Sequence, residues 1–283
     1  MFDTAIIVLL YNKEISDSTT LSSLISSGTQ FSNAKLVIWN NGPNELTSCD
    51  VSFLTNLGYK VQIEETLHNE SLAVIYNFFI NNNQAEKYIF LDDDSTLNAN
   101  YIKAACRSAA SVVSMPMISS GGKVKNPVIN SIVYSKGQNI TANDKVITIG
   151  SGLVVGKGVV HELLRSFNSV FDERFYLYGV DTTFCHRLTL SRLVASIRII
   201  VGFEHSLSRL ETESERVTKF RQKERSYDFG MTLRYYYSFP RALYILARIT
   251  LHVLKCILLS KKRVFSILFL FRAYITGKHY KAL

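Results

Sequence analysis

YIFLDDDSTL (88–97) joins two features that rarely meet in a sequence: an apolar run and three consecutive carboxylates. The first four residues are apolar, with aromatic and β-branched side chains, which is typical of a short buried strand. Asp92, Asp93 and Asp94 follow directly. Adjacent carboxylates repel one another, so this cluster requires a cation, an array of hydrogen-bond donors or a well-solvated turn. Two interpretations are open at this point: a ligand site, or a solvated loop in which Asp94 or Ser95 caps the next helix.

Short apolar runs recur on both sides of this strand, with helical patterns between them. Leu21, Leu24 and Ile25 repeat at i, i+3 and i+4, and residues 72–79 repeat the same spacing. Strands that alternate with helices through residue 91 predict βαβ units and a mostly parallel sheet. The predicted strands are AIIVLL (5–10), KLVIW (35–39), YKVQI (59–63), YIFL (88–91), SIVY (131–134) and GLVV (152–155).

Polar residues follow three of the predicted strands. They are Tyr11-Asn12, Asn40-Asn41-Gly42 and the three aspartates. Ligands of parallel sheets bind outside the carboxyl ends of the strands, and glycine lets the backbone approach a ligand closely. We therefore expect a crevice at this edge with a nucleotide as its occupant, although Asn40-Asn41-Gly42 taken alone also fits a plain turn.

A second dense polar segment, FDERFYLYGVDTTFCHRL (171–188), lies in the later half of the chain. Asp181 precedes Phe184 and Leu188 at helical spacing, so we expect it near the start of a helix, as a functional carboxylate or as a cap. Residues 121–150 are rich in Gly, Asn, Lys and Ser, and predict a long loop or a hairpin region.

The positive charge of the chain is concentrated at its C-terminus. The 283 residues carry 32 Lys and Arg against 23 Asp and Glu, a net charge of +9. Residues 240–283 hold nine of the basic residues and no acidic one, which leaves 32 − 9 = 23 basic and 23 acidic residues in 1–239. The interleaved residues are mostly aliphatic and the body is neutral, so we do not expect nucleic acid as a partner.

Within this basic extension, ALYILARITLHVLKCILLS (242–260) has the composition of an amphipathic helix. Arg248, His252 and Lys255 interrupt it and share one helical face, so a membrane span is not expected. Aliphatic residues beside a basic face are typical of a helix that lies on an anionic membrane surface. The alternative is a C-terminal helix that packs on the rest of the protein.

The cysteines and the N-terminus indicate a cytosolic protein. Four cysteines lie far apart without a C-x-x-C pair, which predicts reduced thiols: Cys49, Cys106, Cys185 and Cys256. MFDTAIIVLLYN (1–12) lacks a basic region before its short apolar run, so it is interpreted as a first strand and not as a signal peptide.

Taken in order, six segments resemble the inverting glycosyltransferases of family 2, especially rhamnosyltransferase-like members of bacterial polysaccharide and O-antigen (lipopolysaccharide) biosynthesis. The resemblance covers about residues 4–210, and EHSLS (204–208) is similar to a late His segment of the family. The sequence departs from the family at Asn40, where an Asp is usual, and at Ser71, where a Gly is usual. The six segments are AIIVLLYN, IWNNG, HNESLAVIYN, FLDDDS, GSGLVV and FDERFYLYGVDTTFCHRL.

This resemblance implies an α/β fold of the GT-A type over residues 1–210, with a nucleotide-sugar-binding half (1–110) and an acceptor half (111–210). Residues 211–283 would form a helical, basic, membrane-contacting extension. The implied partners are a nucleotide-sugar donor (rhamnose or galactofuranose), a lipid-linked glycan acceptor and an anionic membrane, on the inner face of the bacterial plasma membrane. The implied cofactor is a divalent cation, Mg²⁺ or Mn²⁺. The implied residues are Asp181 as catalytic base, Tyr11, Asn40, Asn69, Asn77, Asp92 and Asp93 for the donor, and Asp94 and His205 for the metal.

Two other functions stay open. Asp92-x-Asp94 after an apolar strand also fits the first motif of haloacid-dehalogenase-type phosphatases, in which the first Asp is a nucleophile and the second an acid. That strand usually opens the phosphatase fold, whereas three strands are predicted before it here. The other alternative is a module that binds a nucleotide sugar or a membrane without turnover. A calcium-binding EF-hand is excluded, because its sixth and twelfth positions would be Leu97 and Lys103.

Overall fold

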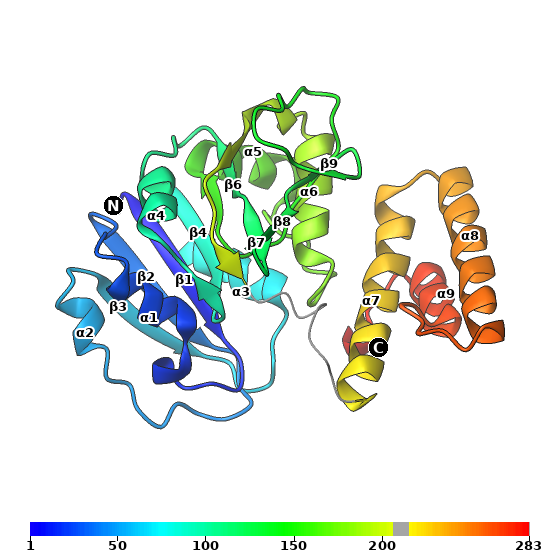
Figure 1. The fold of residues 1–283 in the computed structure, drawn as a ribbon, viewed down its shortest axis with the longest axis horizontal. Helices are drawn as coiled ribbons and strands as arrows, with labels where there is room; N and C mark the ends of the chain where they lie inside the picture. Colours follow the sequence, from blue (N-terminus) through cyan, green and yellow to red (C-terminus); the bar gives the residue numbers. More distant parts are fainter. Residues whose placement is uncertain (206–214, 283) are drawn as a thin grey trace.

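The protein is built on a seven-stranded β-sheet that is parallel at every pairing except those of one strand (Figure 1). The computed structural model describes residues 1–205 and 215–282; the predicted boundary at residue 210 and the last three residues of EHSLS lie outside the described residues. The strand order is β13-β6-β12-β4-β1-β2-β3. The bounds are β1 (Thr4–Leu10), β2 (Ala34–Asn40), β3 (Lys60–Glu65), β4 (Lys87–Asp92), β6 (Val113–Pro116), β12 (Leu153–Gly156) and β13 (Ile197–Ile200).

The N-terminal half of the sheet confirms the predicted βαβ pattern. The four strands predicted before residue 92 are all present, with ends within two residues of the predicted ones. β1 pairs in parallel with both β2 and β4, and β2 pairs in parallel with β3. β12, which contains the predicted GLVV strand, is antiparallel to β4 and β6. The observed sheet is that of the predicted α/β class.

Helices cover both faces of the sheet, which explains why β1 is apolar at almost every position. Residues 5, 7 and 9 face one hydrophobic cluster, and residues 6, 8 and 10 face the other. The first cluster includes residues of α3 (Leu72–Asn82), α5 (Lys157–Phe167) and α6 (Val180–Leu190). The second includes residues of α1 (Thr19–Ser26), α2 (Ser52–Thr55) and α4 (Ala99–Cys106). Single-turn helices are η1 (Ile15–Asp17), η2 (Val194–Ser196) and η3 (Tyr280–Ala282).

Short strands flank the carboxyl edge of the sheet. β5 and β14 lie beside β7 and β8 in a four-stranded sheet of order β5-β14-β7-β8. The Gly- and Asn-rich region 121–150 forms part of this sheet and of a second small sheet, β10-β9-β11, as the hairpin prediction expected. The bounds are β5 (Ser95–Thr96), β7 (Ile118–Ser120), β8 (Lys123–Asn126), β9 (Val128–Ile129), β10 (Ile132–Val133), β11 (Val146–Ile147) and β14 (Glu204–His205).

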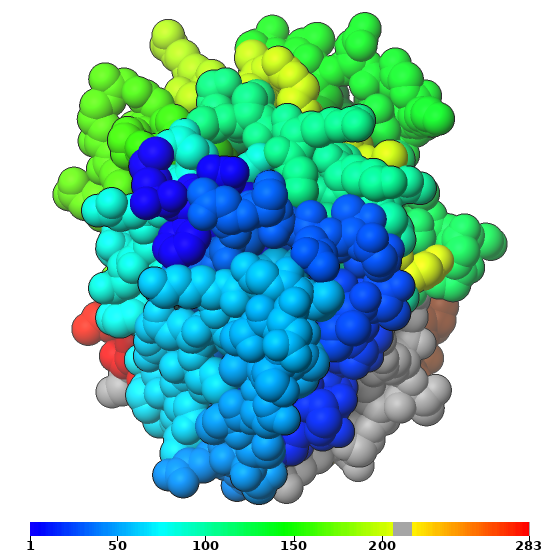
Figure 2. Space-filling model, turned by 90° about the vertical axis from the view of Figure 1, so that its left-hand side faces the viewer, coloured from blue at the N-terminus to red at the C-terminus, as the bar shows by residue number. Residues whose placement is uncertain are grey.

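Three C-terminal helices, α7 (Glu215–Tyr236), α8 (Phe239–Leu258) and α9 (Ile267–Thr276), stand on one side of the sheet domain (Figure 1). Tyr227 and Met231 of α7 and Ala273 of α9 belong to the hydrophobic core of that domain. α7 and α9 therefore pack on the body, whereas α8, which covers most of the segment 242–260, lies outermost and packs on α7 and α9 through Ala242 and Leu246 (Figure 1). Viewed from the β3 side, residues of the N-terminal part of the chain, coloured blue to cyan, fill most of the front, and the C-terminal helices show only at the margins (Figure 2). No described helix is both long and apolar enough to cross a membrane.

Gly230 allows the backbones of α7 and α9 to approach closely, and a substitution at this position tests the packing of the two helices. A Cβ atom at Gly230 would lie 2.4 Å from the Leu270 carbonyl oxygen and 2.8 Å from the Ala273 Cβ. In an open helix, glycine-to-alanine substitution stabilises by up to about 1 kcal/mol. We expect Gly230→Ala instead to destabilise by about 1–3 kcal/mol, because the two backbones must separate. A lowered melting temperature in calorimetry supports the packing, and a raised one contradicts it.

Candidate active site

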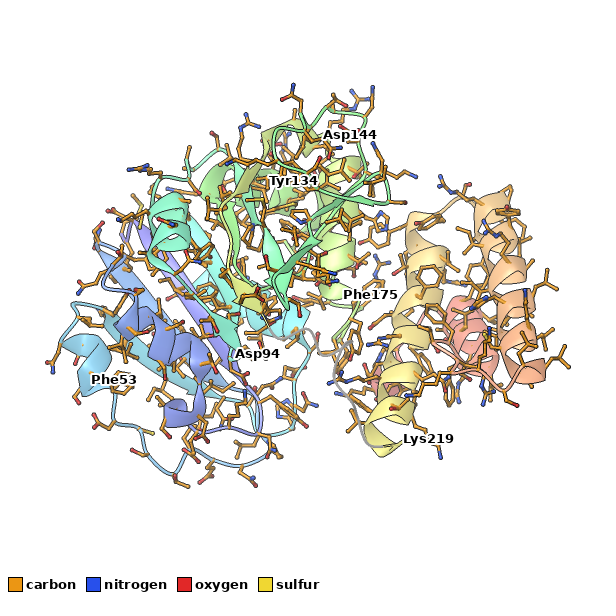
Figure 3. The ribbon with its side chains drawn as sticks, in the orientation of Figure 1. Phe53, Asp94, Tyr134, Asp144, Phe175 and Lys219 are labelled. Carbon is orange, nitrogen blue, oxygen red and sulfur yellow. The ribbon has the colours of Figure 1, made fainter. Side chains whose placement is uncertain are left out.

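The parallel register brings the predicted polar strand ends to one edge. Leu10 of β1 is opposite Asn40 of β2, and Leu9 is opposite Asp92 of β4. Backbone hydrogen bonds join the connections beyond the strands: the Asn41 N–H donates to the Leu10 carbonyl (2.9 Å), and the Asn12 N–H donates to the Gly42 carbonyl (2.7 Å). Asp94 lies at the end of these central strands, in the middle of the molecule (Figure 3).

At this edge, Asp92, Asp94 and His205 form a cluster with the composition of a metal site. One ligand atom from each lies within 4.8 Å of the others. The His205 Nδ1 is 3.2 Å from the Asp94 Oδ1, and its Nε2 is 3.7 Å from the Asp92 Oδ2. His205 reaches the aspartates because β14 pairs with β5, which places it opposite Ser95. The sequence predicted Asp94 and His205 for this role, while Asp92 was assigned to the donor.

The electrostatics of the cluster favour a bound cation. Burial and the neighbouring charges of Asp94, Asp93 and Asp181 raise the pKa of Asp92 to about 8. Burial also raises the pKa of Asp94 and lowers that of His205, which leaves a neutral imidazole able to bind a metal. The Asp94 Oδ1 is buried and accepts no hydrogen bond from the described residues. An orphaned carboxylate oxygen, a second carboxylate and a neutral imidazole fit a divalent cation such as Mg²⁺ or Mn²⁺.

Hydroxyl groups that the sequence analysis did not single out hold this cluster in place. The Ser95 Oγ lies 3.1 Å from the His205 Nδ1 and 2.7 Å from the Ser151 Oγ. The Ser151 Oγ accepts the Asp92 backbone N–H (3.1 Å), and the Thr20 hydroxyl donates to the Asp92 carbonyl (2.5 Å). Such hydrogen bonds orient metal ligands. Ser95 and Ser151 lie inside the quoted motifs FLDDDS and GSGLVV, so proximity to those motifs was the available signal.

Asp93 points to a different partner. Its Oδ1 accepts a hydrogen bond from the Lys13 ammonium (2.8 Å), and its backbone carbonyl accepts from Ser18 and Thr20 at the start of α1. The middle aspartate therefore has a local counter-ion, and the two outer aspartates face the cluster. This division explains how three adjacent carboxylates are accommodated.

Asp181 lies in the first turn of α6, as predicted, and its charge reaches the aspartate cluster. Its Oδ2 accepts the Gly150 N–H (3.1 Å) and its Oδ1 accepts the Thr182 N–H (3.0 Å). By contrast, the Asp172 carboxylate is buried and already bonded to Arg174 and the Tyr236 hydroxyl. Of these two carboxylates in the 171–188 segment, Asp181 is the one whose charge acts on Asp92.

The C-terminal extension also contributes to the position of Asp181. Asp228 of α7 is buried, and its Oδ2 accepts the Tyr178 N–H at 2.9 Å. The Gly179 N–H also faces this carboxylate, directly at the start of α6. Asp228 therefore fixes the turn that carries Asp181. Sequence reasoning missed this residue because nothing in a single helical segment shows which distant turn its carboxylate meets.

The predicted donor residues fall into two groups in the structure. Tyr11 is 49% exposed at the end of β1, and Asn69 is half-buried with a left-handed backbone (φ 55°). Asn40 is buried, and its amide bonds Glu65, the Asn44 carbonyl and the Gly42 N–H. Asn77 is buried and joins α3 to the 170–173 segment through four hydrogen bonds. The side chains of Asn40 and Asn77 thus build the scaffold, and the donor contact predicted for them stays a prediction.

Comparisons with solved structures place this fold among the GT-A proteins. The structure is similar to S. aureus TarS, with a TM-score of 0.53 at 15% identity over 87% of this chain and 42% of TarS. It is similar to TarS 1–349 in complex with UDP-GlcNAc (TM-score 0.53, 15% identity, 81% of this chain, 65% of that one) and with UDP (0.51, 14%, 83%, 64%). The chain thus spans less than two thirds of the length of each of these three TarS chains. No family model and no curated protein matches the sequence. The predicted GT-A fold class is confirmed.

The raised pKa of Asp92 predicts how metal binding depends on pH. A cation that binds Asp92 must displace its proton, so Mn²⁺ affinity should rise between about pH 6.5 and about 8.5. In metal-free protein the folded-state pKa of Asp92, about 8, exceeds the ordinary value of 3.8. Between these two pH values the folded state therefore binds one more proton than the unfolded state. The stability contribution of Asp92 is therefore lost as the pH rises through about 8, and Mn²⁺ should restore stability.

Titration calorimetry of chelator-treated protein in two buffers with different ionisation enthalpies measures both the affinity and the protons released. We expect Asp94→Asn to abolish high-affinity Mn²⁺ binding. Asp50→Asn, the same chemical change at a position exposed to solvent, should leave it intact. Mn²⁺ affinity that is independent of pH, or equal in wild type and Asp94→Asn, contradicts the assignment.

Proposed function

We propose that this protein is a metal-dependent, inverting glycosyltransferase of family 2 that transfers one sugar from a nucleotide diphosphate donor to a lipid-linked glycan. The observation that carries the proposal is the arrangement of Asp92, Asp94 and His205 beside Asp181 at the carboxyl edge of a GT-A sheet. A cation site and a separate fixed carboxylate are the two groups that such a transfer requires. Turnover distinguishes this function from a module that only binds the donor.

The donor would lie at the carboxyl ends of β1 and β4. A divalent cation held by Asp94 and His205, with Asp92 as a further ligand or as a contact to the ribose, supplies neutralising charge to the diphosphate leaving group. Tyr11, which is 49% exposed, presents an aromatic face to the base at the end of β1. Asn69 lies near the turn that follows β2, because its Oδ1 accepts a hydrogen bond from the Asn41 amide (3.3 Å).

Asp181 would act as the general base that removes the proton of the acceptor hydroxyl. Direct displacement with inversion needs one such base on the face opposite the leaving group. The hydrogen bonds from the Gly150 and Thr182 backbone N–H groups fix the carboxylate without neutralising it. Its position at the N-terminal end of α6 also stabilises its ionised form through the helix dipole.

The donor sugar, the acceptor and the cellular location belong to the same proposal. Rhamnose and galactofuranose are the favoured sugars, from the style of the sequence motifs, in the assembly of a bacterial surface polysaccharide such as an O-antigen. Because TarS has been crystallised with UDP-GlcNAc, that nucleotide sugar belongs in the same donor panel. Release of nucleotide in the presence of each donor with Mg²⁺ or Mn²⁺ identifies the sugar.

The outer face of α8 is the surface that would contact an anionic membrane on the cytoplasmic side. Leu251 and Leu258 are 68% and 84% exposed on this face. Arg241, Arg248 and Lys255 follow one another at intervals of seven residues along the adjoining strip. An apolar face beside a basic strip suits the boundary between headgroups and acyl chains. Membrane contact through α8 explains why large aliphatic side chains face solvent here.

The catalytic part of the proposal is tested by Asp181→Asn, which keeps the shape of the side chain and removes the proton acceptor. We expect the transfer rate to fall by roughly 10²–10⁴, with nucleotide affinity nearly unchanged. Glu162→Gln, the equivalent change on α5 at a side chain that is 44% exposed, is the matched control. A normal rate in Asp181→Asn, or a defect confined to donor binding, would assign the base to another residue.

The membrane part is tested by the double variant Leu251→Gln/Leu258→Gln. Both positions are exposed, so the melting temperature should not change, while sedimentation with vesicles containing phosphatidylglycerol should decrease strongly. Leu190→Gln removes a leucine that is 61% exposed on α6 and serves as the control. Wild-type binding should also weaken with salt. Undiminished sedimentation of the double variant would exclude this face of α8. Truncation at residue 239 is a poorer test, because it would remove α9 from the core.

A further inference from the structure

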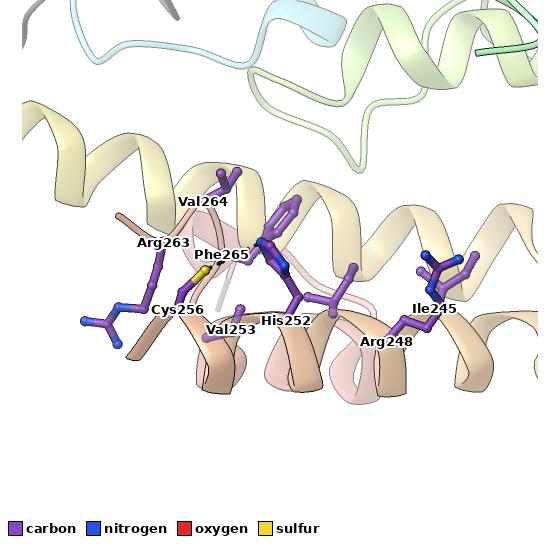
Figure 4. Close-up of a pocket in the computed structure, with 9 residues that line it drawn as sticks. Ile245, Arg248, His252, Val253, Cys256, Arg263, Val264 and Phe265 are labelled. Atoms are coloured by element: carbon purple, nitrogen blue, oxygen red, sulfur yellow. Dashed lines mark hydrogen bonds between the residues drawn. The ribbon is translucent and has the colours of Figure 1, made fainter. Parts of the chain in front are cut away.

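A cavity of about 400 Å³ lies along α8, on the side that faces α7 (Figure 4). Its apolar lining comes from Ile245, Ile249 and Val253 of α8 and from Val264 and Phe265 of the following segment. Figure 4 shows Ile245, Val264 and Phe265 of this lining between the two helices. This groove is separate from the Asp92–Asp94–His205 cluster, and neither the proposed donor nor the proposed acceptor hydroxyl uses it.

The far wall of the groove is built in place by hydrogen bonds to α7. The Gln222 amide donates to the Arg263 carbonyl (2.8 Å), and the Ser266 N–H donates to the Ser226 hydroxyl (2.9 Å). Phe265 also packs on Phe229 of α7, with ring centroids 5.4 Å apart. These contacts hold residues 263–266 beside α8, so the groove exists before any ligand enters.

The polar lining of the groove is basic. Arg248, His252 and Arg263 contribute side chains, and no carboxylate lines the cavity among the residues that the structure describes. Neither arginine forms an ion pair with a described residue, and residues 240–283 contain no acidic side chain at all. In Figure 4, Arg263 lies near one end of the groove and Arg248 near the other. An apolar groove between two guanidinium groups is complementary to a hydrocarbon chain that carries a phosphate.

We propose that this groove binds one molecule of anionic phospholipid, with an acyl chain on the apolar floor and the phosphate at Arg248, while Arg263 attracts the anion from the other end of the groove. The inference rests on the membrane contact proposed for α8. Arg248 lies on α8 between the outward-facing leucines and the groove residues Ile245 and Ile249. A lipid at the bilayer surface can therefore contact Arg248 and the groove at the same time. The volume is near the lower end of the usual range for ligand pockets, about 300–1,000 Å³, which suits a single chain.

Native mass spectrometry of the full-length protein in mild detergent, with equal concentrations of phosphatidylglycerol and phosphatidylcholine, tests the proposal. We expect one phosphatidylglycerol to be retained in preference to phosphatidylcholine. The double variant Arg248→Gln/Arg263→Gln should bind it roughly 25-fold more weakly, if each arginine contributes as basic residues do at an anionic surface. Arg241→Gln/Lys261→Gln removes the same charge from exposed residues outside the groove lining, and its affinity for phosphatidylglycerol should fall much less.

A second variant tests the cavity itself without a change in charge. Ile249→Trp places a larger side chain on the groove floor and should abolish lipid retention while its melting temperature stays near that of wild type. Equal losses in the two charge variants would overturn the proposal in favour of diffuse attraction. A dimer that is weakened by the groove variants would assign the groove to a second copy of the chain, and displacement of the phospholipid by equimolar prenyl phosphate would assign it to a lipid carrier.

Failure of this inference is distinguishable from failure of the proposed function. If vesicle sedimentation depends on Leu251 and Leu258 but no lipid is retained in detergent, only the groove proposal is wrong. If the full-length protein does not sediment with anionic vesicles at all, the membrane contact on which the proposal rests is wrong. Transfer to a short soluble acceptor requires neither, and it reports on the catalytic crevice alone.

Discussion

Mutual repulsion among carboxylates at the end of β4 is the constraint on which the site depends. Asp92 and Asp94 face one crevice, and the charge of Asp181 reaches Asp92 from the start of α6. Lys13 is paired with Asp93 and its charge also reaches Asp94, whereas burial lowers the pKa of His205 and favours its neutral form. The pKa of about 8 means that Asp92 retains a proton near neutral pH, which relieves this repulsion. A divalent cation at the cluster would replace that proton, as the proposed metal site requires.

The scaffold that holds these charges comes from segments far apart in the sequence. Ser151, at the turn into β12, touches both the Asp92 backbone and Ser95, while β14 brings His205 alongside β5. Asp228 and Tyr236, at two levels of α7, bond Tyr178 and Asp172, which both precede Gly179. The geometry of the crevice is consequently shared between the sheet domain and the C-terminal helices. This sharing explains why α7 and α9 are part of the main core.

The parallel half of the fold was predictable because its information is local. β1 is apolar on both faces, α3 has helical spacing, and polar residues end each strand, so the edge with Asp92 and Asn40 followed from general rules. The antiparallel direction of β12 was not predictable, since an apolar run has no direction. The roles of Asn77 and Asn40 were missed for a related reason: an amide that completes a buried hydrogen-bond network and an amide that awaits a ligand are identical in sequence.

The positions of α7 and α8 determine how far the proposed acceptor must extend from the membrane. α7 carries Asp228 on the side of the sheet domain, and α8 lies on its opposite side (Figure 1). Packed helices are about 8–10 Å apart, and each is about 10–12 Å wide with its side chains. If the outer face of α8 rests on a membrane, Asp181 is then separated from the bilayer by roughly the width of two helices, about 20 Å. An acceptor hydroxyl on the first sugar of a lipid carrier would not extend that far, whereas a chain of several sugars would. With the proposed membrane contact, this separation would suit elongation of an existing glycan better than its initiation on the lipid.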